Sequence, residues 1–397
     1  MITDRNAAID EIMAIINEKK TELDQLNRDI WEHPEIADQE FYALKRQEEF
    51  LPTLGFKFEK PYDDVPTAYI ATRETGKGGK CFAFCAEYDA LPVIGHGCGH
   101  NFNCVNAVSA GWGLAEYLER HNIPGKVIIF GTPAEEGKGG KVRMLRHGCL
   151  EGVDAVMMSH AGSNTNGHGN VSSWIHRYEV EFKGKASHAA SNPWKGLNAL
   201  DAQLLLFHAV ALNRQQSEKT AIIHGIIKQG GDAVNVIPDH TVSMFSIRST
   251  VVRVMETLID RFMHMVQGAA EMTGTEATVR EVAVPYMGRR TNWTLEEPVL
   301  EAFERYGMAV DHKHPAPGDG SSDFGDFSQT IPGGYPKTAV SLTPVPGHSI
   351  EKREACNTDY SREQCRKSGA GMAFAGLIYL TDADFRAKVQ EEFEKNA

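Results

Sequence analysis

Long apolar runs and a surplus of basic residues are both missing from this 397-residue sequence. No apolar run approaches the roughly 20 residues needed to span a bilayer, so we expect no membrane partner. The 53 Asp and Glu residues outnumber the 41 Lys and Arg residues, which gives a formal net charge of −12. Nucleic-acid binding depends on a basic patch, so we expect no nucleic-acid partner either.

Paired cysteines and two common hydrolase motifs are also lacking. Seven cysteines is an odd number for a disulfide framework and favours a reducing, cytoplasmic compartment. The first twenty residues contain acids throughout and predict an amphipathic helix rather than a signal peptide. The absence of H-E-x-x-H excludes the helical zincin arrangement, and the absence of G-x-S-x-G argues against a serine hydrolase.

The apolar pattern of the first part of the chain predicts strands that alternate with helices. Short apolar runs over 81–86, 127–130 and 155–158 predict strands, and helical patterns over 104–121 and 141–147 lie between them. Such alternation is typical of a mostly parallel sheet covered by helices on both faces.

The pattern changes near residue 174. The following 110 residues or so predict the order β-α-β-β-α-β, which is the split βαβ pattern of a ferredoxin-like α+β domain. Alternation then resumes, with a strand expected over 338–342. We therefore predict an α/β domain formed by residues 1–174 and 286–397, with an α+β domain over 175–285 inserted into it.

Candidate metal ligands follow four of the predicted strands at their carboxyl ends. In open α/β sheets, sites form at that edge, so we expect these side chains to converge. They are Glu87, Asp89, His96, Cys98 and His100 after the first strand, Glu135 and Glu136 after the second, His160 after the third and His348 after the strand over 338–342.

Cys98 and His100 are separated by one residue in a glycine-rich turn, which favours binding of one ion by both. His96 is either a third ligand or a residue that orients the ligands by a hydrogen bond, and we favour the second role. Asp89 is expected to accept a hydrogen bond from a ligating histidine. If one carboxylate of the Glu135–Glu136 pair binds metal, the other can act as a base toward water.

Several motifs taken together resemble one family of dinuclear metallo-amidohydrolases. This family, peptidase family M20, includes aminoacylase, carboxypeptidase G and the auxin-conjugate hydrolases, and the branch with p-aminobenzoyl-glutamate hydrolase looks most similar. The motifs occur in the order AEYDALP, GHGCGHN, GTPAEEGKGG, GKASHAA, GGDAVNVIPD, SSDFGDFS and PGHS, and they cover nearly the whole chain.

The resemblance implies a phosphorylase/hydrolase-like catalytic domain with an inserted lid domain that forms a homodimer. It also implies two divalent ions per subunit, zinc or manganese, with Glu135 as the general base and Asp89 as the supporting carboxylate. Many relatives have a histidine where this sequence has Glu87. The implied metal ligands are Cys98, His100, Glu136, His160 and His348.

Three residues of the inserted domain would complete the site in this resemblance. His188 matches a histidine that stabilises the oxyanion across the dimer, and Asn235 and Arg248 match residues that hold a substrate carboxylate. Arg248 could instead pair within the fold. Asp323 and Asp326 are both expected near the site, and the sequence does not tell which of them supports it.

We therefore predict a metal-dependent amidohydrolase that cleaves the amide bond of an N-acyl, aminoacyl or aroyl amino acid. Two alternatives remain open at this stage. An aminohydrolase could release ammonia from a substituted arylamine at the same site, or the chain could be a non-catalytic partner subunit. Retention of Glu135 together with all the candidate ligands argues against the second alternative.

Overall fold

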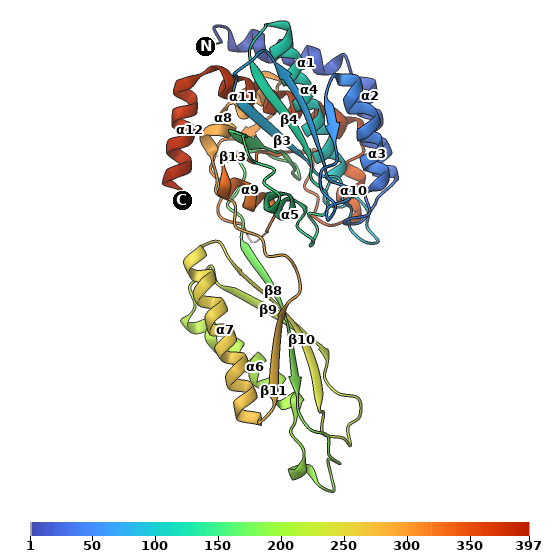
Figure 1. Cartoon of the computed structure of the whole chain (residues 1–397), viewed down its shortest axis with the longest axis vertical. Coiled ribbons are helices and arrows are strands. Elements are labelled where there is room, and N and C mark those ends of the chain that lie inside the picture. The colour runs from blue at the N-terminus through green and yellow to red at the C-terminus, as the bar shows by residue number, and fades with distance from the viewer. Residues whose placement is uncertain (1, 319, 397) are drawn as a thin grey trace. The chain divides into compact units, whose positions relative to one another are not determined.

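The computed structural model describes residues 2–318 and 320–396. They divide into two compact units, which are described separately (Figure 1). Unit 1 comprises Met1–Val171, Arg289–Ala316 and Asp323–Ala397, and unit 2 comprises Ser172–Gly288 and Pro317–Ser322.

The core of unit 1 is a six-stranded mixed sheet. Four of its strands are parallel to one another, and two more extend one edge, each pairing with its neighbours in antiparallel fashion. In sheet order, the strands are β1 (Lys57–Glu59), β2 (Tyr69–Thr75), β4 (Gly125–Gly131), β3 (Cys81–Ala86), β5 (Ala155–Met157) and β13 (Gly333–Gly334).

The central strand β3 is buried at every position because helices cover both faces of the sheet. Phe82 and Phe84 enter the larger core beneath α1, α2, α4 and α11, whereas Cys81 and Cys85 enter a second core beneath α5 and α9. The α-helices of unit 1 are α1 (Arg5–Asn17), α2 (Lys20–Glu32), α3 (Phe41–Phe50), α4 (His100–Arg120), α5 (Gly140–Arg146), α8 (Trp293–Arg305), α9 (Phe324–Thr330), α10 (Ile350–Ala355), α11 (Asp359–Thr381) and α12 (Ala383–Lys395).

A second, small sheet of unit 1 corrects one prediction. The strand expected over 338–342 is only the two residues of β14 (Lys337–Thr338), and it does not join the main sheet. It pairs in parallel with β6 (His160–Ala161), and the chain leaves the sheet before His348. The other strands of this sheet are β7 (Asn166–Gly167) and β12 (Val310–Asp311).

Unit 2 is an antiparallel four-stranded sheet in the order β11-β8-β10-β9, with helices α6 and α7 packed against one face (Figure 1). The alternating pattern of β10 accounts for this, because Phe245 and Ile247 enter the helix-covered core. The elements are β8 (Trp174–Lys183), α6 (Ala199–Asn213), β9 (Ile222–Gln229), β10 (His240–Ser249), α7 (Val252–Thr273) and β11 (Glu276–Glu281). The predicted fold class, an α/β domain with a separate ferredoxin-like α+β domain, is confirmed.

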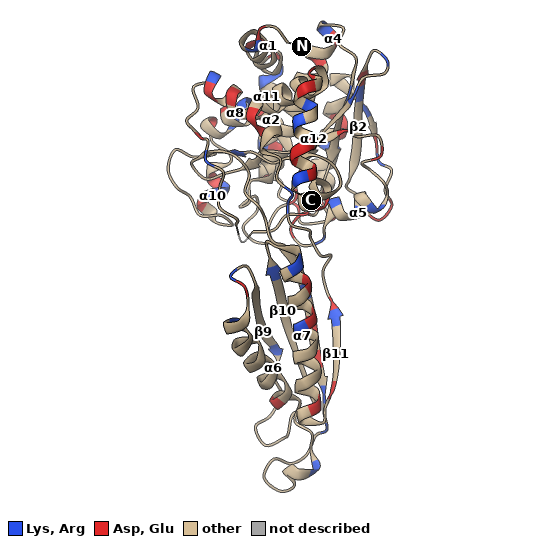
Figure 2. Cartoon of the chain, turned by 90° about the vertical axis from the view of Figure 1, so that its left-hand side faces the viewer, with Lys and Arg blue, Asp and Glu red and all other residues tan. Residues whose placement is uncertain are grey.

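Charged residues of both signs are interspersed along helices such as α7 and α12 (Figure 2). Among residues 2–318 and 320–396, no helix is long and apolar enough to cross a membrane.

Candidate metal centre

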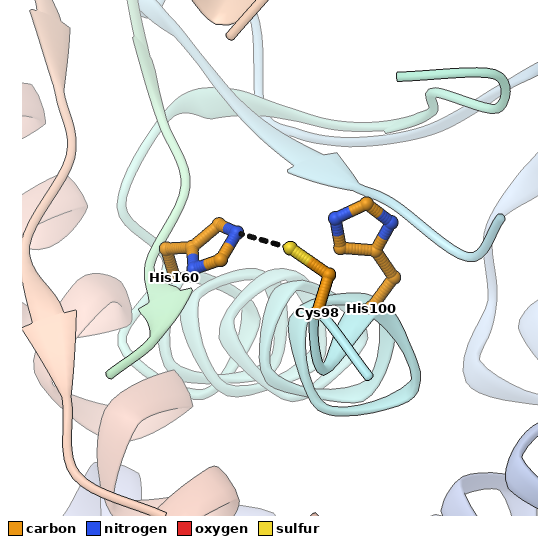
Figure 3. A group of neighbouring side chains, drawn as sticks. All are labelled: Cys98, His100 and His160. Carbon is orange, nitrogen blue, oxygen red and sulfur yellow. Dashed lines mark hydrogen bonds between the residues drawn. The ribbon is translucent and has the colours of Figure 1, made fainter. Parts of the chain in front are cut away.

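Cys98, His100 and His160 meet where helix α4 begins beside strand β6 (Figure 3). The Cys98 sulfur lies 3.7 Å from Nε2 of His160. Ligand atoms of the three side chains all lie within 4.8 Å of one another. Gly99 makes this approach possible, since it has a φ of +86° and a Cβ there would lie 2.6 Å from Cβ of Ala161.

Asp89 organises the site from the loop that follows β3. Its Oδ1 lies 2.9 Å from Nδ1 of His100, and its Oδ2 accepts a hydrogen bond from the backbone N–H of Glu136 at 2.9 Å. The carboxylate therefore fixes the orientation of the His100 ring and leaves Nε2 facing the site. This is the contact with a candidate ligand that the sequence led us to expect for Asp89.

Glu136 and His348 form a second group around the same sulfur. Ligand atoms of Cys98, Glu136 and His348 lie within 4.8 Å of one another, and Nε2 of His348 is 3.5 Å from Oε1 of Glu136. His348 has a φ of +53°, a left-handed conformation that costs energy in a non-glycine residue. Its backbone N–H donates to the carbonyl of Gly97, which ties this loop to the turn that holds Cys98.

Glu135 belongs to two groups of side chains that lie at ligand distance from one another. Its carboxylate is within 4.8 Å of His100 and Glu136, and also within that distance of Glu87 and Asp323. Burial raises the pKa of Glu135 well above its usual value, and the charge of Glu136 raises it further. A neighbouring cation would offset this repulsion and keep both carboxylates charged.

Lys141 is a residue of this region that was not predicted from the sequence. It is fully buried on α5, and its Nζ lies 2.5 Å from Glu87 and 2.7 Å from Asp323. Burial alone would raise the pKa of Glu87, but Lys141 and His100 lower it to about 2. Glu87 is thus already paired with a cation of the chain itself. A lysine that follows two glycines is typical of an exposed loop, so the sequence did not indicate that Lys141 is buried between two carboxylates.

The two C-terminal aspartates occupy different positions. Asp323 pairs with Lys141 and belongs to a group at ligand distance with Glu87 and Glu135. Asp326 lies in the first turn of α9, and its backbone N–H donates to the carbonyl of Asp323.

His96 makes its hydrogen bond to the backbone of α2. Its Nε2 lies 3.0 Å from the carbonyl of Ile30 on α2, so its hydrogen bond goes to the backbone and not to a ligand histidine. Burial lowers its pKa to about 3 and keeps the ring neutral. This contact ties the ligand loop to α2.

The donor atoms of this region fit a divalent cation. Within the described part of the chain, the buried Nε2 of His100 and Oε1 of Glu136 have no hydrogen-bond partner. Burial lowers the pKa of His160 to about 3, so its ring is neutral and available for binding. Burial raises the pKa of Cys98 to about 12, and a bound cation would favour its thiolate form.

The three remaining predicted site residues lie in unit 2. His188 is exposed in the loop after β8, where its Nδ1 accepts the backbone N–H groups of Ala190 and Ser191. Asn235 is exposed in the loop between β9 and β10. Arg248 is half-buried on β10, opposite Ile175 of β8.

Comparison with known proteins covers both units. Residues 173–272 match the peptidase dimerisation domain of the M20 type. The chain is 33% identical over 398 residues to the Xaa-Arg dipeptidase of Mus musculus, covering 95% of this chain and 92% of that one. It is 32% identical to one of the subunits of p-aminobenzoyl-glutamate hydrolase from Escherichia coli, covering 70% of this chain and 61% of that one.

The fold is shared with a crystal structure described as a dinuclear metal binding peptidase from the M20 family, from Bacillus subtilis. The TM-score is 0.70 at 22% sequence identity, and the alignment covers 92% of this chain and 99% of the other. At that identity the likeness concerns the fold.

Proposed function

The chain belongs to the M20 peptidase family of metallohydrolases, and from this membership we propose that it hydrolyses the amide bond of a small, dipeptide-like substrate. The substrate class is an N-acyl, aminoacyl or aroyl amino acid. The observation that carries the proposal is the pair of ligand groups that share the Cys98 sulfur, with the Glu135 carboxylate beside them. The names of two relatives, an Xaa-Arg dipeptidase and a p-aminobenzoyl-glutamate hydrolase, support this class.

Cys98, His100, Glu136, His160 and His348 would hold two divalent ions, with Cys98 common to both groups. Zinc suits the thiolate and imidazole donors, and manganese remains open because a carboxylate is also present. When bound, such ions activate water and polarise the substrate carbonyl.

Glu135 would act as the general base. It is adjacent in sequence to a proposed ligand, and its carboxylate lies within 4.8 Å of ligand atoms of His100 and Glu136. From that position it can take a proton from the attacking water and later deliver it to the leaving nitrogen. Asp89 would keep His100 in the orientation that leaves Nε2 free for binding.

Residues of unit 2 would complete substrate binding. Following the family resemblance, we assign Asn235 and Arg248 to the substrate carboxylate, for which the guanidinium fork is suited. His188 would stabilise the oxyanion, an interaction worth roughly 3–4 kcal/mol in other hydrolases.

We also infer a homodimer formed through unit 2. The match to a dimerisation domain supports it. Leu204 and Leu212 of α6 are 53% and 62% exposed, and Ile226 of the edge strand β9 is 60% exposed. Exposed apolar side chains are common singly on protein surfaces, so the inference rests on the domain match and these residues serve as positions to test it.

The proposal is tested with the matched variants Glu135→Gln and Glu136→Gln, which change neighbouring carboxylates in the same way. We expect Glu135→Gln to keep its metal while its turnover falls roughly 10²–10⁴-fold, because only the base is removed. Glu136→Gln should lose metal as well as activity. Metal content and the release of amino acid from a panel of aminoacyl, N-acyl and aroyl amino acids are measured.

Two results would contradict the proposal. Near-normal activity of Glu135→Gln would remove this residue as the base. Release of ammonia without cleavage of any amide in the panel would show that the chain is an aminohydrolase instead.

A further inference from the structure

A second group of metal-binding side chains lies in unit 1, outside the centre described above. We propose that His168, Glu297 and His314 form a separate structural site for a divalent cation. His168 follows β7, Glu297 lies on α8, and His314 lies in the loop after β12. Their ligand atoms all lie within 4.8 Å of one another. None of these residues belongs to the motifs that define the family resemblance.

His168 carries the main argument for this site. The residue is only 2% exposed, and its buried Nε2 has no hydrogen-bond partner in the described part of the chain. That nitrogen faces Oε1 of Glu297 at 3.5 Å, which is longer than a good hydrogen bond. An unpaired polar atom in a buried position is costly, and a cation between the two groups would satisfy both.

The other side of the His168 ring is already fixed. Its Nδ1 lies 3.0 Å from Oε2 of the buried Glu296. Glu296 is itself held by the backbone N–H groups of Gly169 at 2.9 Å and Tyr335 at 2.7 Å. Histidines that bind metal commonly donate their second ring N–H to a carboxylate in this way, which sets the tautomer and leaves Nε2 for the ion.

His314 is positioned by Trp293. The two rings stack with centroids 3.8 Å apart and an interplanar angle of 20°. Trp293 is anchored in turn by a hydrogen bond from its Nε1 to the carbonyl of Gly169 at 2.9 Å. The ring of His314 thus lies beside that of His168, with a centroid separation of 5.1 Å.

Two imidazoles and one carboxylate favour Zn²⁺ or a similar ion over Ca²⁺ and Mg²⁺, which prefer oxygen ligands alone. Ligand atoms around a tetrahedral zinc with bonds of about 2.0–2.1 Å lie about 3.3 Å apart. The group therefore has to close slightly on binding. Glu297 is exposed and His314 is held by ring stacking, so these two side chains would close on the ion, whereas His168 is buried and bonded to Glu296.

The competing explanation is that His168 is protonated and that no ion binds. Burial opposes protonation of His168, but the hydrogen bond to Glu296 raises its pKa, so a charged ring could pair with both Glu296 and Glu297. That explanation gives His314 no role. The two explanations therefore differ in what happens when His314 is removed.

A bound ion would join two chain segments that are distant in sequence. His168 lies four residues before Ser172, and His314 lies three residues before Pro317, the residues at which the chain passes into unit 2. An ion here would therefore hold together both stretches of unit 1 that lead into the other unit.

The experiment compares His314→Ala with His312→Ala in the full-length protein, with Zn²⁺ as the probe. His312 is a matched control, because it lies in the same loop and pairs with Glu304 instead, at 2.8 Å. We expect His314→Ala to bind one Zn²⁺ fewer per chain than His312→Ala. It should also lose part of the rise in unfolding temperature caused by Zn²⁺.

A second variant, Glu297→Gln, should weaken Zn²⁺ binding at this site at least about tenfold. Losing a residue that only hydrogen-bonds to a ligand already lowers metal affinity about 10–100-fold, and Glu297 is itself a proposed ligand. Equal Zn²⁺ stoichiometry and equal stabilisation in His314→Ala and His312→Ala would overturn the proposal. The comparison rests on the difference between these variants, so it holds whatever number of ions the proposed catalytic centre binds.

Discussion

Replacing Lys141 by methionine tests the charge arrangement beside the candidate metal centre. The Lys141 Nζ lies between Glu87 and Asp323, and all three side chains are fully buried. Methionine has a similar length and is apolar, so the substitution removes the charge while filling most of the space. Two carboxylates then remain in the interior without their cation.

The expected loss of stability follows from these distances. At an effective dielectric constant of about 20, two charges 2.7 Å apart attract each other by about 6 kcal/mol, and burying each ion costs several kcal/mol. The intact group therefore contributes little net stability. Removing one partner leaves the burial cost unmatched, and the free energy of unfolding should fall by about 3–5 kcal/mol at pH 7.

The pH dependence gives this prediction a sign. The pKa of Glu87 is lowered to about 2 in the folded protein, against an ordinary value of 4.5. Its contribution to stability is therefore present above pH 4.5 and is lost as the pH falls toward 2. Because Lys141→Met lacks this contribution, its deficit relative to wild type should be largest near neutral pH and should shrink below pH 4.5.

Urea unfolding at several pH values measures the effect. Lys138→Met is the matched control, because Lys138 is an exposed residue of the loop just before α5, and a change of no more than about 0.5 kcal/mol is expected there. The reasoning would be refuted if Lys141→Met stayed within 1 kcal/mol of wild type at pH 7, or if its deficit grew as the pH was lowered.

Two further predictions concern the pH response and the assembly of the chain. Burial and the charge of Asp89 raise the pKa of Glu40 to about 7, so wild type should lose up to about 3 kcal/mol of stability relative to Glu40→Gln as the pH rises from 5 to 8. A difference in the free energy of unfolding between the two proteins that stays constant from pH 5 to pH 8 would contradict this. Leu204→Glu places a charge on the exposed face of α6 and should halve the mass measured by light scattering, while Leu342→Glu, at an exposed position in unit 1, should not. A dimer that persists in Leu204→Glu at the same concentration would argue against association through α6.

The elements that the sequence predicted well are those coded by local pattern. The apolar run over 81–86 is strand β3 with the same limits, because a strand buried on both faces needs apolar residues throughout. The helical pattern over 104–121 ends within one residue of α4, which runs from His100 to Arg120. In both cases the signal lies within the segment itself.

The elements that were missed depend on distant partners. Strand β13 consists of Gly333 and Gly334, which carry no strand signal and are extended because they pair with β5. The apolar run over 338–342 predicted a strand of the main sheet, but only Thr338 joins a strand, and that strand pairs with β6. His348 therefore reaches the candidate metal centre from a loop.

The sequence by itself determined the fold class and most of the residues that meet around Cys98, because glycine-rich turns after buried strands are local features. Only the tertiary structure decided which charges are paired. It placed Lys141 between two carboxylates, held His96 against α2 and brought His168 to His314. The physical reason is that burial and pairing depend on segments far apart in the chain, whose approach no local pattern encodes.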